Sequence, residues 1–159
     1  MKTIVFLATA ILSISAFAFP TVGDRVTFNG TFTSAQGSAN FMQDLELSAF
    51  DKASNKFTMK IAITLPNGEI KEEEKQVDTS ELMSEETINT IMSVCDSQGG
   101  KLEKITVVAG EFETCKIDHG DGNVSWLGKV PFGVVKERVV DAEKNVVEME
   151  LAMFENGQK

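Results

Sequence analysis

The sequence contains no tyrosine, a single tryptophan and a single histidine among its 159 residues. One histidine excludes multi-histidine metal centres. A serine nucleophile would have to use His119 as its base, and no Gly-x-Ser-x-Gly turn is present to hold such a serine. Glycine-rich phosphate loops and dinucleotide fingerprints are also absent. We therefore predict a non-enzymatic protein with no catalytic residues, no cofactor and no metal.

Basic residues are outnumbered, with 15 Lys and Arg against 24 Asp and Glu and a formal charge of -9. Nucleic-acid binding depends on clustered Lys and Arg that displace counterions. The composition therefore predicts no nucleic-acid partner. A hydrophobic content of 42% and only three prolines are typical of a folded domain, and the length suits one domain.

The first 18 residues have the layout of a secretory signal peptide. Lys2 supplies a positive charge, residues 4–14 form an apolar run, and Ala16 and Ala18 provide the small-x-small pattern read by signal peptidase. The run is shorter than the roughly 20 residues of a membrane-spanning helix. We predict a signal peptide at 1–18, a single domain at 19–159 and a periplasmic or secreted protein. No transmembrane segment is expected after cleavage, which would change the formal charge from -9 to -10 because Lys2 is removed.

Hydrophobic and polar residues alternate through most of the remaining chain. A period of two places the apolar side chains on one face of a β-strand. Strands are predicted around 26–32, 45–47, 57–65, 69–77, 102–108, 111–117, 124–127, 132–140 and 146–155.

One segment, 84–95, has helical periodicity instead. Ser84 is a suitable N-cap, and Ile88, Ile91, Met92 and Cys95 follow at spacings of three and four. The predicted fold class is therefore α+β and mostly antiparallel: a curved sheet or half-barrel of about nine strands with one short amphipathic helix.

Turn and edge signals accompany the strands. Asn67-Gly68 predicts a hairpin turn, since this pair accepts positive φ. The run Glu72-Glu73-Glu74 predicts a solvated edge strand that resists pairing with other chains.

The two cysteines, Cys95 and Cys115, are predicted to form a disulfide from helix to sheet, because an exported chain meets an oxidising environment. The alternatives are thiol chemistry with His119 as base, or a zinc site that would need a fourth ligand. Asp118, Asp121 and Asn123 suggest calcium, but their spacing does not match an EF-hand and favours an exposed Gly-rich turn that carries His119.

Two strands and the helix supply flexible apolar side chains of the kind that line lipid pockets. The alternative is an ordinary filled core. The predicted pocket residues are Phe57, Met59, Ile61, Ile63, Ile88, Met92, Met149, Leu151 and Met153.

A second set of residues forms a C-terminal motif: Gly110, Phe112, Trp126, Pro131, Phe132 and Gly133. Gly110 is expected at a bend and Pro131 at a sheet edge, where it breaks the ladder before Phe132 resumes it. Phe112 and Trp126 are expected to bury large areas.

This motif resembles a signature of small exported bacterial β-sheet proteins of unassigned function, namely the TapB-like proteins and a related domain family of unknown function. The resemblance covers the last third of the chain. It implies a curved antiparallel sheet similar to that of lipoprotein carriers such as the Lol system, and a periplasmic setting. It implies no catalytic residue.

These observations predict an exported binding or carrier protein that holds an apolar or lipid ligand beneath the helix at 84–95. The alternative is a protein-interaction module that uses strand edges or the acidic surface to bind a protein partner. A hydrolase is the third hypothesis, and it would require two nearby carboxylates.

Overall fold

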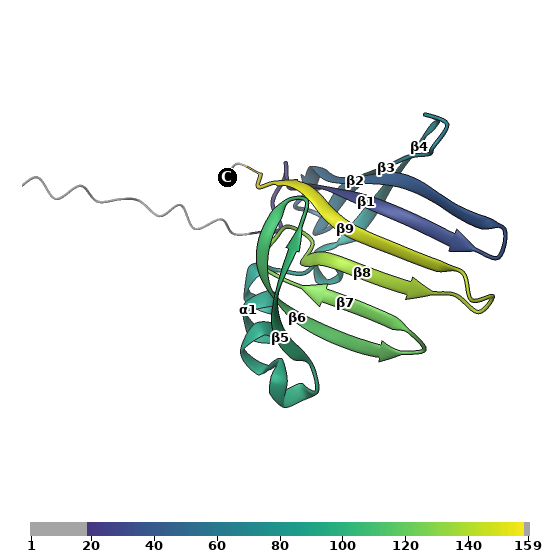
Figure 1. Cartoon of the computed structure of the whole chain (residues 1–159). Helices are drawn as coiled ribbons and strands as arrows, with labels where there is room; N and C mark the ends of the chain where they lie inside the picture. Colours follow the sequence, from purple (N-terminus) through teal and green to yellow (C-terminus); the bar gives the residue numbers. More distant parts are fainter. Residues whose placement is uncertain (1–18, 158–159) are drawn as a thin grey trace, which may run out of the picture.

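The structure, a computed structural model, describes residues 19–157, so the predicted signal peptide lies outside the described residues. Nine strands and one α-helix are present (Figure 1). Two 3₁₀ turns, Thr79–Glu81 and Asp96–Gln98, flank the helix. The elements are β1 (Arg25–Ser34), β2 (Gly37–Asp51), β3 (Lys56–Thr64), β4 (Ile70–Asp78), α1 (Glu85–Val94), β5 (Lys101–Val107), β6 (Gly110–Gly120), β7 (Asn123–Leu127), β8 (Val134–Val140) and β9 (Val146–Glu155).

All nine strands belong to one sheet with the order β4-β3-β2-β1-β9-β8-β7-β6-β5. Every neighbouring pair is antiparallel. The sheet stays open, because its two edge strands, β4 and β5, are not paired with each other. The predicted fold class, mostly antiparallel β with one short helix, is therefore confirmed. The predicted edge position of Glu72-Glu73-Glu74 is also confirmed, since these residues are exposed on β4.

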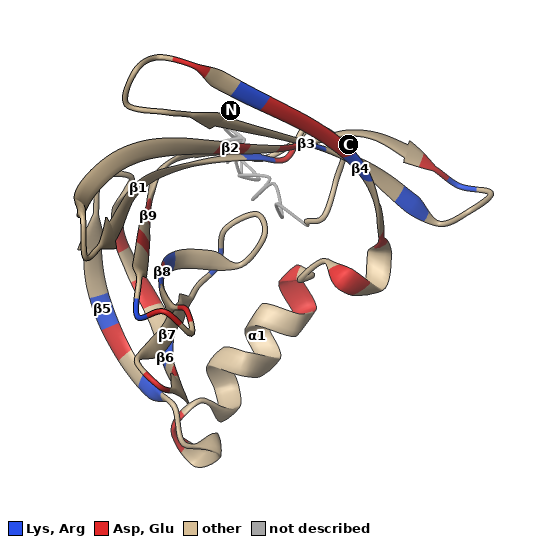
Figure 2. Cartoon of the chain, turned by 90° about the vertical axis from the view of Figure 1, so that its right-hand side faces the viewer, with Lys and Arg blue, Asp and Glu red and all other residues tan. Residues whose placement is uncertain are grey.

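The first and last strands pair at the middle of the sheet. The β5–β6 hairpin reaches the same region, where the Ala109 N–H donates to the Leu151 carbonyl at 3.1 Å. In Figure 2, α1 lies beside one face of the sheet, and the loop that precedes β8 extends toward that side.

The turn between β6 and β7 is tighter than predicted. The sequence predicts a loop from Asp118 to Asn123, whereas β6 continues to Gly120 and only Asp121 and Gly122 form the turn. Both turn residues have positive φ, 52° and 85°, which suits a two-residue hairpin turn. Two side chains brace the hairpin: Asp118 accepts from the Gly120 N–H, and the Asn123 side-chain amide donates to the Gly120 carbonyl at 3.2 Å. The Asn123 Oδ1 also accepts from the Val140 N–H, which links the hairpin to β8.

The prediction that Pro131 lies at a sheet edge and that Phe132 resumes a strand is wrong. Strand β8 begins only at Val134 and lies inside the sheet, between β7 and β9. Residues 128–133 form a loop closed by hydrogen bonds between Gly128 and Gly133 and between Gly133 and Val130, each 2.9 Å. Phe132 has a φ of 63°, which is incompatible with a strand. Val130 and Pro131 are fully buried, so this loop is part of the core.

The core consists of three clusters that this loop connects. Val130 belongs to the central cluster, and Phe132 packs against both the central and the β3 cluster. A Cβ on Gly133 would lie 2.7 Å from the Cδ1 of Ile88, in the helix cluster. The buried members are Val26, Phe28, Val107, Val130, Val135 and Leu151 (central cluster), Leu47, Phe57, Met59 and Val77 (β3 cluster), and Phe19, Ile88 and Leu127 (helix cluster).

We predict that Gly133→Ala lowers the free energy of unfolding by about 3 kcal/mol, since the new methyl group would meet Met83 and Ile88 and the residue has a φ of 76°. Gly120→Ala is the matched control. Gly120 also has positive φ, 84°, but nothing lies within 4 Å of its added Cβ, so only about 1 kcal/mol should be lost. Urea denaturation measures both values, and equal losses would contradict the close packing around the loop.

Candidate functional site

Helix α1 begins and ends as predicted. The Ser84 side chain accepts from the Thr87 N–H at 3.1 Å, and Glu85 and Glu86 occupy the first turn, where the helix dipole favours negative charge. Ile88 is completely buried and fixes the inner face of the helix against the core. Cys95 follows directly after the last helical residue.

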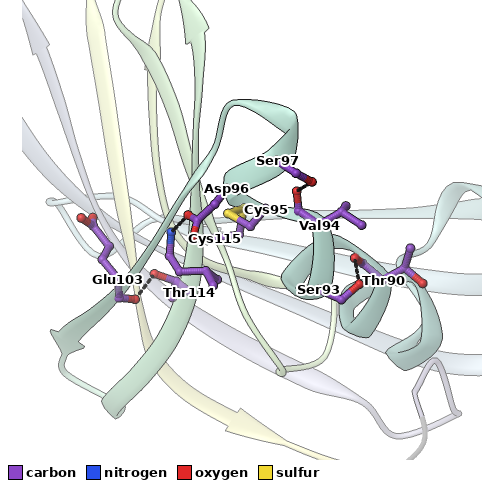
Figure 3. Close-up of a disulfide and its surroundings, with 10 residues drawn as sticks. Thr90, Ser93, Val94, Cys95, Asp96, Ser97, Glu103, Thr114 and Cys115 are labelled. Atoms are coloured by element: carbon purple, nitrogen blue, oxygen red, sulfur yellow. Dashed lines mark hydrogen bonds between the residues drawn. A yellow bond between two sulfur atoms is a disulfide. The ribbon is translucent and has the colours of Figure 1, made fainter.

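The predicted disulfide between Cys95 and Cys115 is confirmed, and it ties the end of α1 to β6 (Figure 3). Both cysteines are buried, and the bond leaves neither thiol for zinc or for thiol chemistry. Gly100 must be a glycine here, because a Cβ would lie 2.7 Å from the Cys95 Sγ and 2.9 Å from the Cys115 Sγ. Asp96 links the end of the helix to β5 as well, since its Oδ1 accepts from the Leu102 N–H at 3.0 Å.

A groove of about 580 Å³ lies between α1 and the β5–β6 hairpin, and we call it the α1–β5 groove. Its apolar part comes from Met92 on the helix and Leu102 on β5, whose 45% exposure is high for a leucine. Lys104 and Lys129 are its cations and Glu103 and Glu113 its anions, so the groove is formally neutral in a strongly acidic chain. The lining residues are Asn89, Met92, Ser93, Leu102, Glu103, Lys104, Glu113, Thr114 and Lys129.

The predicted pocket residues are distributed over the core. Phe57, Met59 and Ile61 pack in or against the β3 cluster, whereas Leu151 and Met149 belong to or pack against the central cluster. Ile63, on the same strand β3, is partly buried. Ile88 is in the helix cluster. Of the predicted set, only Met92 lines the α1–β5 groove.

Met153 does not continue the inward face of β9. The β1–β9 register shifts between Thr27 and Phe28, so that Thr27 pairs with Met153, Phe28 pairs with Leu151, and Ala152 is bulged. Met153 is consequently 44% exposed, and Phe154 packs against the central cluster. A bulge has no reliable signal in a single sequence, so the alternation alone missed it.

The remaining residues of the C-terminal motif, Gly110, Phe112 and Trp126, lie in a hairpin turn or contact neighbouring side chains. Phe112 packs against Phe154, with ring centroids 6.0 Å apart, and Gly110 adopts a φ of 133° at the tip of the β5–β6 hairpin. Trp126 pairs with Lys116 and Lys136 on the neighbouring strands, and their Nζ atoms lie 5.3 and 5.5 Å from its ring centroid.

The Trp126 Nε1–H donates to the Glu103 Oε1 at 2.8 Å. Glu103 also lines the α1–β5 groove. This hydrogen bond, followed by the one from Lys101, holds the pKa of Glu103 below its ordinary value, because both stabilise the carboxylate. The indole is thereby linked to the groove, a connection that the sequence does not reveal because Glu103 and Trp126 are 23 residues apart.

Within residues 19–157, no group of three or more His, Cys, Asp or Glu side chains is placed to hold a metal ion. His119 was predicted to lie in a loop; it is exposed near the end of β6, and its Nε2 is 3.0 Å from the Ser125 Oγ. In the described part of the chain, no helix is both long and apolar enough to cross a bilayer.

A second groove, of about 500 Å³, lies over β1–β4 and is acidic. Its lining holds Asp44, Glu46 and Glu72-Glu73-Glu74 against Arg25 and Lys60. Arg25 pairs with Asp44 at 3.1 Å. Figure 2 shows the red acidic stretch of β4 that borders it. Five carboxylates against two cations give this groove a net negative charge, whereas the α1–β5 groove is formally neutral.

No protein-family model matches the chain, and no curated protein matches it. The class of the protein is therefore defined by its own geometry: a mostly antiparallel β protein with a disulfide-anchored helix and a surface groove beside that helix.

We predict that replacing both cysteines with alanine lowers the free energy of unfolding by about 3 kcal/mol, since the bond joins residues 20 positions apart and restricts the unfolded chain. Hydrogen exchange should quicken in α1 more than in β1 and β9, which lie at the sheet centre. The reduced natural chain serves as the control and should behave alike. Unchanged exchange in α1 would show that the bond does not hold the helix.

We also predict that Glu103→Gln costs about 1 kcal/mol at pH 7, because the charged hydrogen bond to Trp126 is weakened. The folded-state pKa is lowered, so the stabilisation is present above the ordinary Glu pKa of about 4.3 and is lost as pH falls through the folded-state pKa. The difference between the variant and the natural chain should thus shrink as the pH falls below about 4.3 and vanish once Glu103 is protonated in the folded state. The fluorescence of the single tryptophan follows the unfolding of both chains. Glu113→Gln, which changes an exposed residue on β6, is the control and should leave the emission unchanged.

Proposed function

We propose that this protein is an exported, non-enzymatic binding protein that holds an apolar ligand in the α1–β5 groove. The observation that carries the proposal is the juxtaposition of Met92 and Leu102 on the two sides of one groove, with polar and charged groups around them. Ligand sites commonly combine an apolar lining with a few polar groups that set orientation.

This site differs from the internal pocket expected beneath the helix. The loop 128–133 occupies the inner side of α1, where Gly133 approaches Met83 and Ile88. An acyl chain inside would have to displace Val130 and Phe132 from the core. Binding at the groove requires no such displacement, because Leu102 is already exposed.

Two features support the exported setting. The disulfide is buried and joins the helix to the sheet, as is common in proteins of oxidising compartments. The sequence of residues 1–18 has the layout of a cleaved signal peptide. The periplasm or the cell exterior is accordingly the proposed location.

A protein-interaction function is the second candidate, and the free edge of β5 favours it. The Leu102 N–H donates to Asp96 and so points away from β6. The backbone N–H and C=O groups of every second residue along β5 point the same way. Lys104 and Thr106 therefore present backbone groups to an added strand, which could lay a side chain in the α1–β5 groove.

We predict that Leu102→Gln weakens apolar ligand binding at least about tenfold, because the leucine contributes roughly 1.5–3 kcal/mol of apolar burial when covered. Decanoate is the probe, followed by chemical-shift titration. Val108→Gln is the matched control, since Val108 is 63% exposed but does not line the groove.

Native mass spectrometry of protein purified from its own host completes the test. An added mass that Leu102→Gln abolishes and Val108→Gln retains would support ligand carriage. A single unliganded mass together with no saturable decanoate shifts would contradict it. Protection of the Lys104 and Thr106 amides by a partner protein, without decanoate binding, would favour the second candidate.

A further inference from the structure

The inner face of the sheet, on which α1 and the loop 128–133 pack, is covered mainly at one end. Figure 1 shows α1 at one end of the sheet and the β1–β2, β6–β7 and β8–β9 turns at the opposite end. The loop 128–133 lies at the α1 end, since Gly133 approaches Met83 and Ile88. In the part of the chain that the structure describes, no helix lies on the inner face beside the three turns.

Apolar side chains occupy this uncovered part of the inner face. Phe32 on β1 pairs with Val147 on β9, and Val147 pairs with Val139 on β8. The alternation of side chains along β1 and β9 places Phe32 and Val147 on the same face as the core residues Phe28 and Leu151. Phe32 is nevertheless 39% exposed and Val139 is 40% exposed, because no second layer covers them.

Two half-buried residues extend this apolar surface toward the core. Phe41 on β2 and Met149 on β9 pair with Gly30 from its two sides. The Phe41 ring lies over Gly30, where an added Cβ would clash with the Phe41 Cζ. The exposed and half-buried members together form what we call the turn-end patch: Phe32, Phe41, Val139, Val147 and Met149. Contiguous exposed apolar surface of this kind marks interaction sites in soluble proteins.

One carboxylate borders the turn-end patch. Glu137 pairs with Met149 and lies on the inner face, two residues before Val139. It is half-buried, and within residues 19–157 it takes part in no ion pair. Ser125, its neighbour on β7, has its Oγ 3.0 Å from the Nε2 of His119 instead.

The cations adjacent to Glu137 in the chain belong to the opposite face of the sheet. The Lys136 Nζ lies 5.5 Å from the ring centroid of Trp126, and the Arg138 Nη1 lies 3.8 Å from the Glu148 Oε1. The nearby β8–β9 turn, residues 141–145, contains two acids and one lysine. The turn-end patch is therefore apolar with negative charge beside it.

We propose that the turn-end patch binds an amphipathic helix of a partner protein, with a lysine or arginine of that helix directed at Glu137. The patch is smaller than the roughly 20–30 residues that each partner contributes to a standard interface between domains. A single helix, whose apolar side chains follow at spacings of three and four, suits a surface of this size. The proposal is independent of ligand binding in the α1–β5 groove.

Charge selects this occupant over three others. A second copy of the chain would bring another acidic surface, since the formal charge is -9. A fatty acid or an anionic membrane would place further negative charge beside Glu137, which is unfavourable. A cationic amphipathic helix covers the apolar side chains and pairs the carboxylate at the same time.

The chemistry is tested with an amphipathic peptide of leucine and lysine, about 14 residues long, titrated against the purified protein and followed by amide chemical shifts. We expect saturable shifts in β1, β8 and β9 beside the turns. Phe32→Thr should weaken binding at least about fivefold and Glu137→Gln about threefold. Both residues lie outside the buried core clusters, so the variants should fold, and circular dichroism checks this.

Two variants on the opposite face of the sheet are the matched controls. Met153→Thr removes another apolar side chain that is 44% exposed, and Glu150→Gln removes another half-buried carboxylate. Both should leave the affinity for the peptide unchanged. Equal affinities in all four variants, shifts confined to the acidic strand β4, or equally tight binding of a leucine–glutamate peptide would overturn the proposal.

Photocross-linking tests the natural occupant. The aromatic analogue p-benzoylphenylalanine replaces Phe32 in the protein exported by its own host, and the cross-linked segment is sequenced. We expect a segment with apolar residues at helical spacing and at least one lysine or arginine, in a yield that Glu137→Gln lowers. A cross-link to a second copy or to lipid, or a yield no higher than with the same analogue at Met153, would overturn the proposal.

Discussion

The burial of the loop between β7 and β8 is the constraint on which the rest of the structure depends. An open antiparallel sheet has one apolar face that must be covered. Here Val130 and Phe132, which belong to this loop, pack against the apolar face at the end near α1. Gly133 has no side chain, so Ile88 of the helix can lie close to the loop. The loop therefore replaces the ligand or second layer that such a face would otherwise require. Helix α1 packs where this loop and the sheet meet.

The position of the groove follows from that packing. The helix is fixed at its middle by Ile88 and at its end by Cys95, which bonds β6. The side of the helix that carries Asn89, Met92 and Ser93 then faces β5 across the α1–β5 groove, and Met92 also packs against the helix cluster. Trp126 is coupled to the same region through Glu103, so a single hydrogen bond links the outer face of the sheet to the groove.

Local patterns predicted the elements well, whereas long-range packing decided what they form. Alternation indicated the strands, although β2 extends over Gly37–Asp51, well beyond the predicted 45–47. The spacing of Ile88, Met92 and Cys95 indicated the helix, and the presence of two cysteines in a chain predicted to be exported indicated its bond to the sheet. Phe132 was misassigned because an apolar residue followed by Gly-Val-Val favours a strand, and its positive φ depends on tertiary contacts. The groove could not be predicted, because Met92 and Leu102 become neighbours across it only after Gly99-Gly100 reverses the chain.

The two edges of the sheet differ in what they offer a partner. A strand added to β4 would cover exposed Glu72, Glu73 and Glu74 and would have to overcome the desolvation of their carboxylates. A strand added to β5 would gain backbone hydrogen bonds and, from Met92 and Leu102, apolar contact in the adjacent groove. Asp96 already occupies the Leu102 N–H, so the first gain is limited at that end of β5. This comparison favours the proposed apolar ligand over an added strand, because the groove supplies apolar contact without needing the Leu102 N–H.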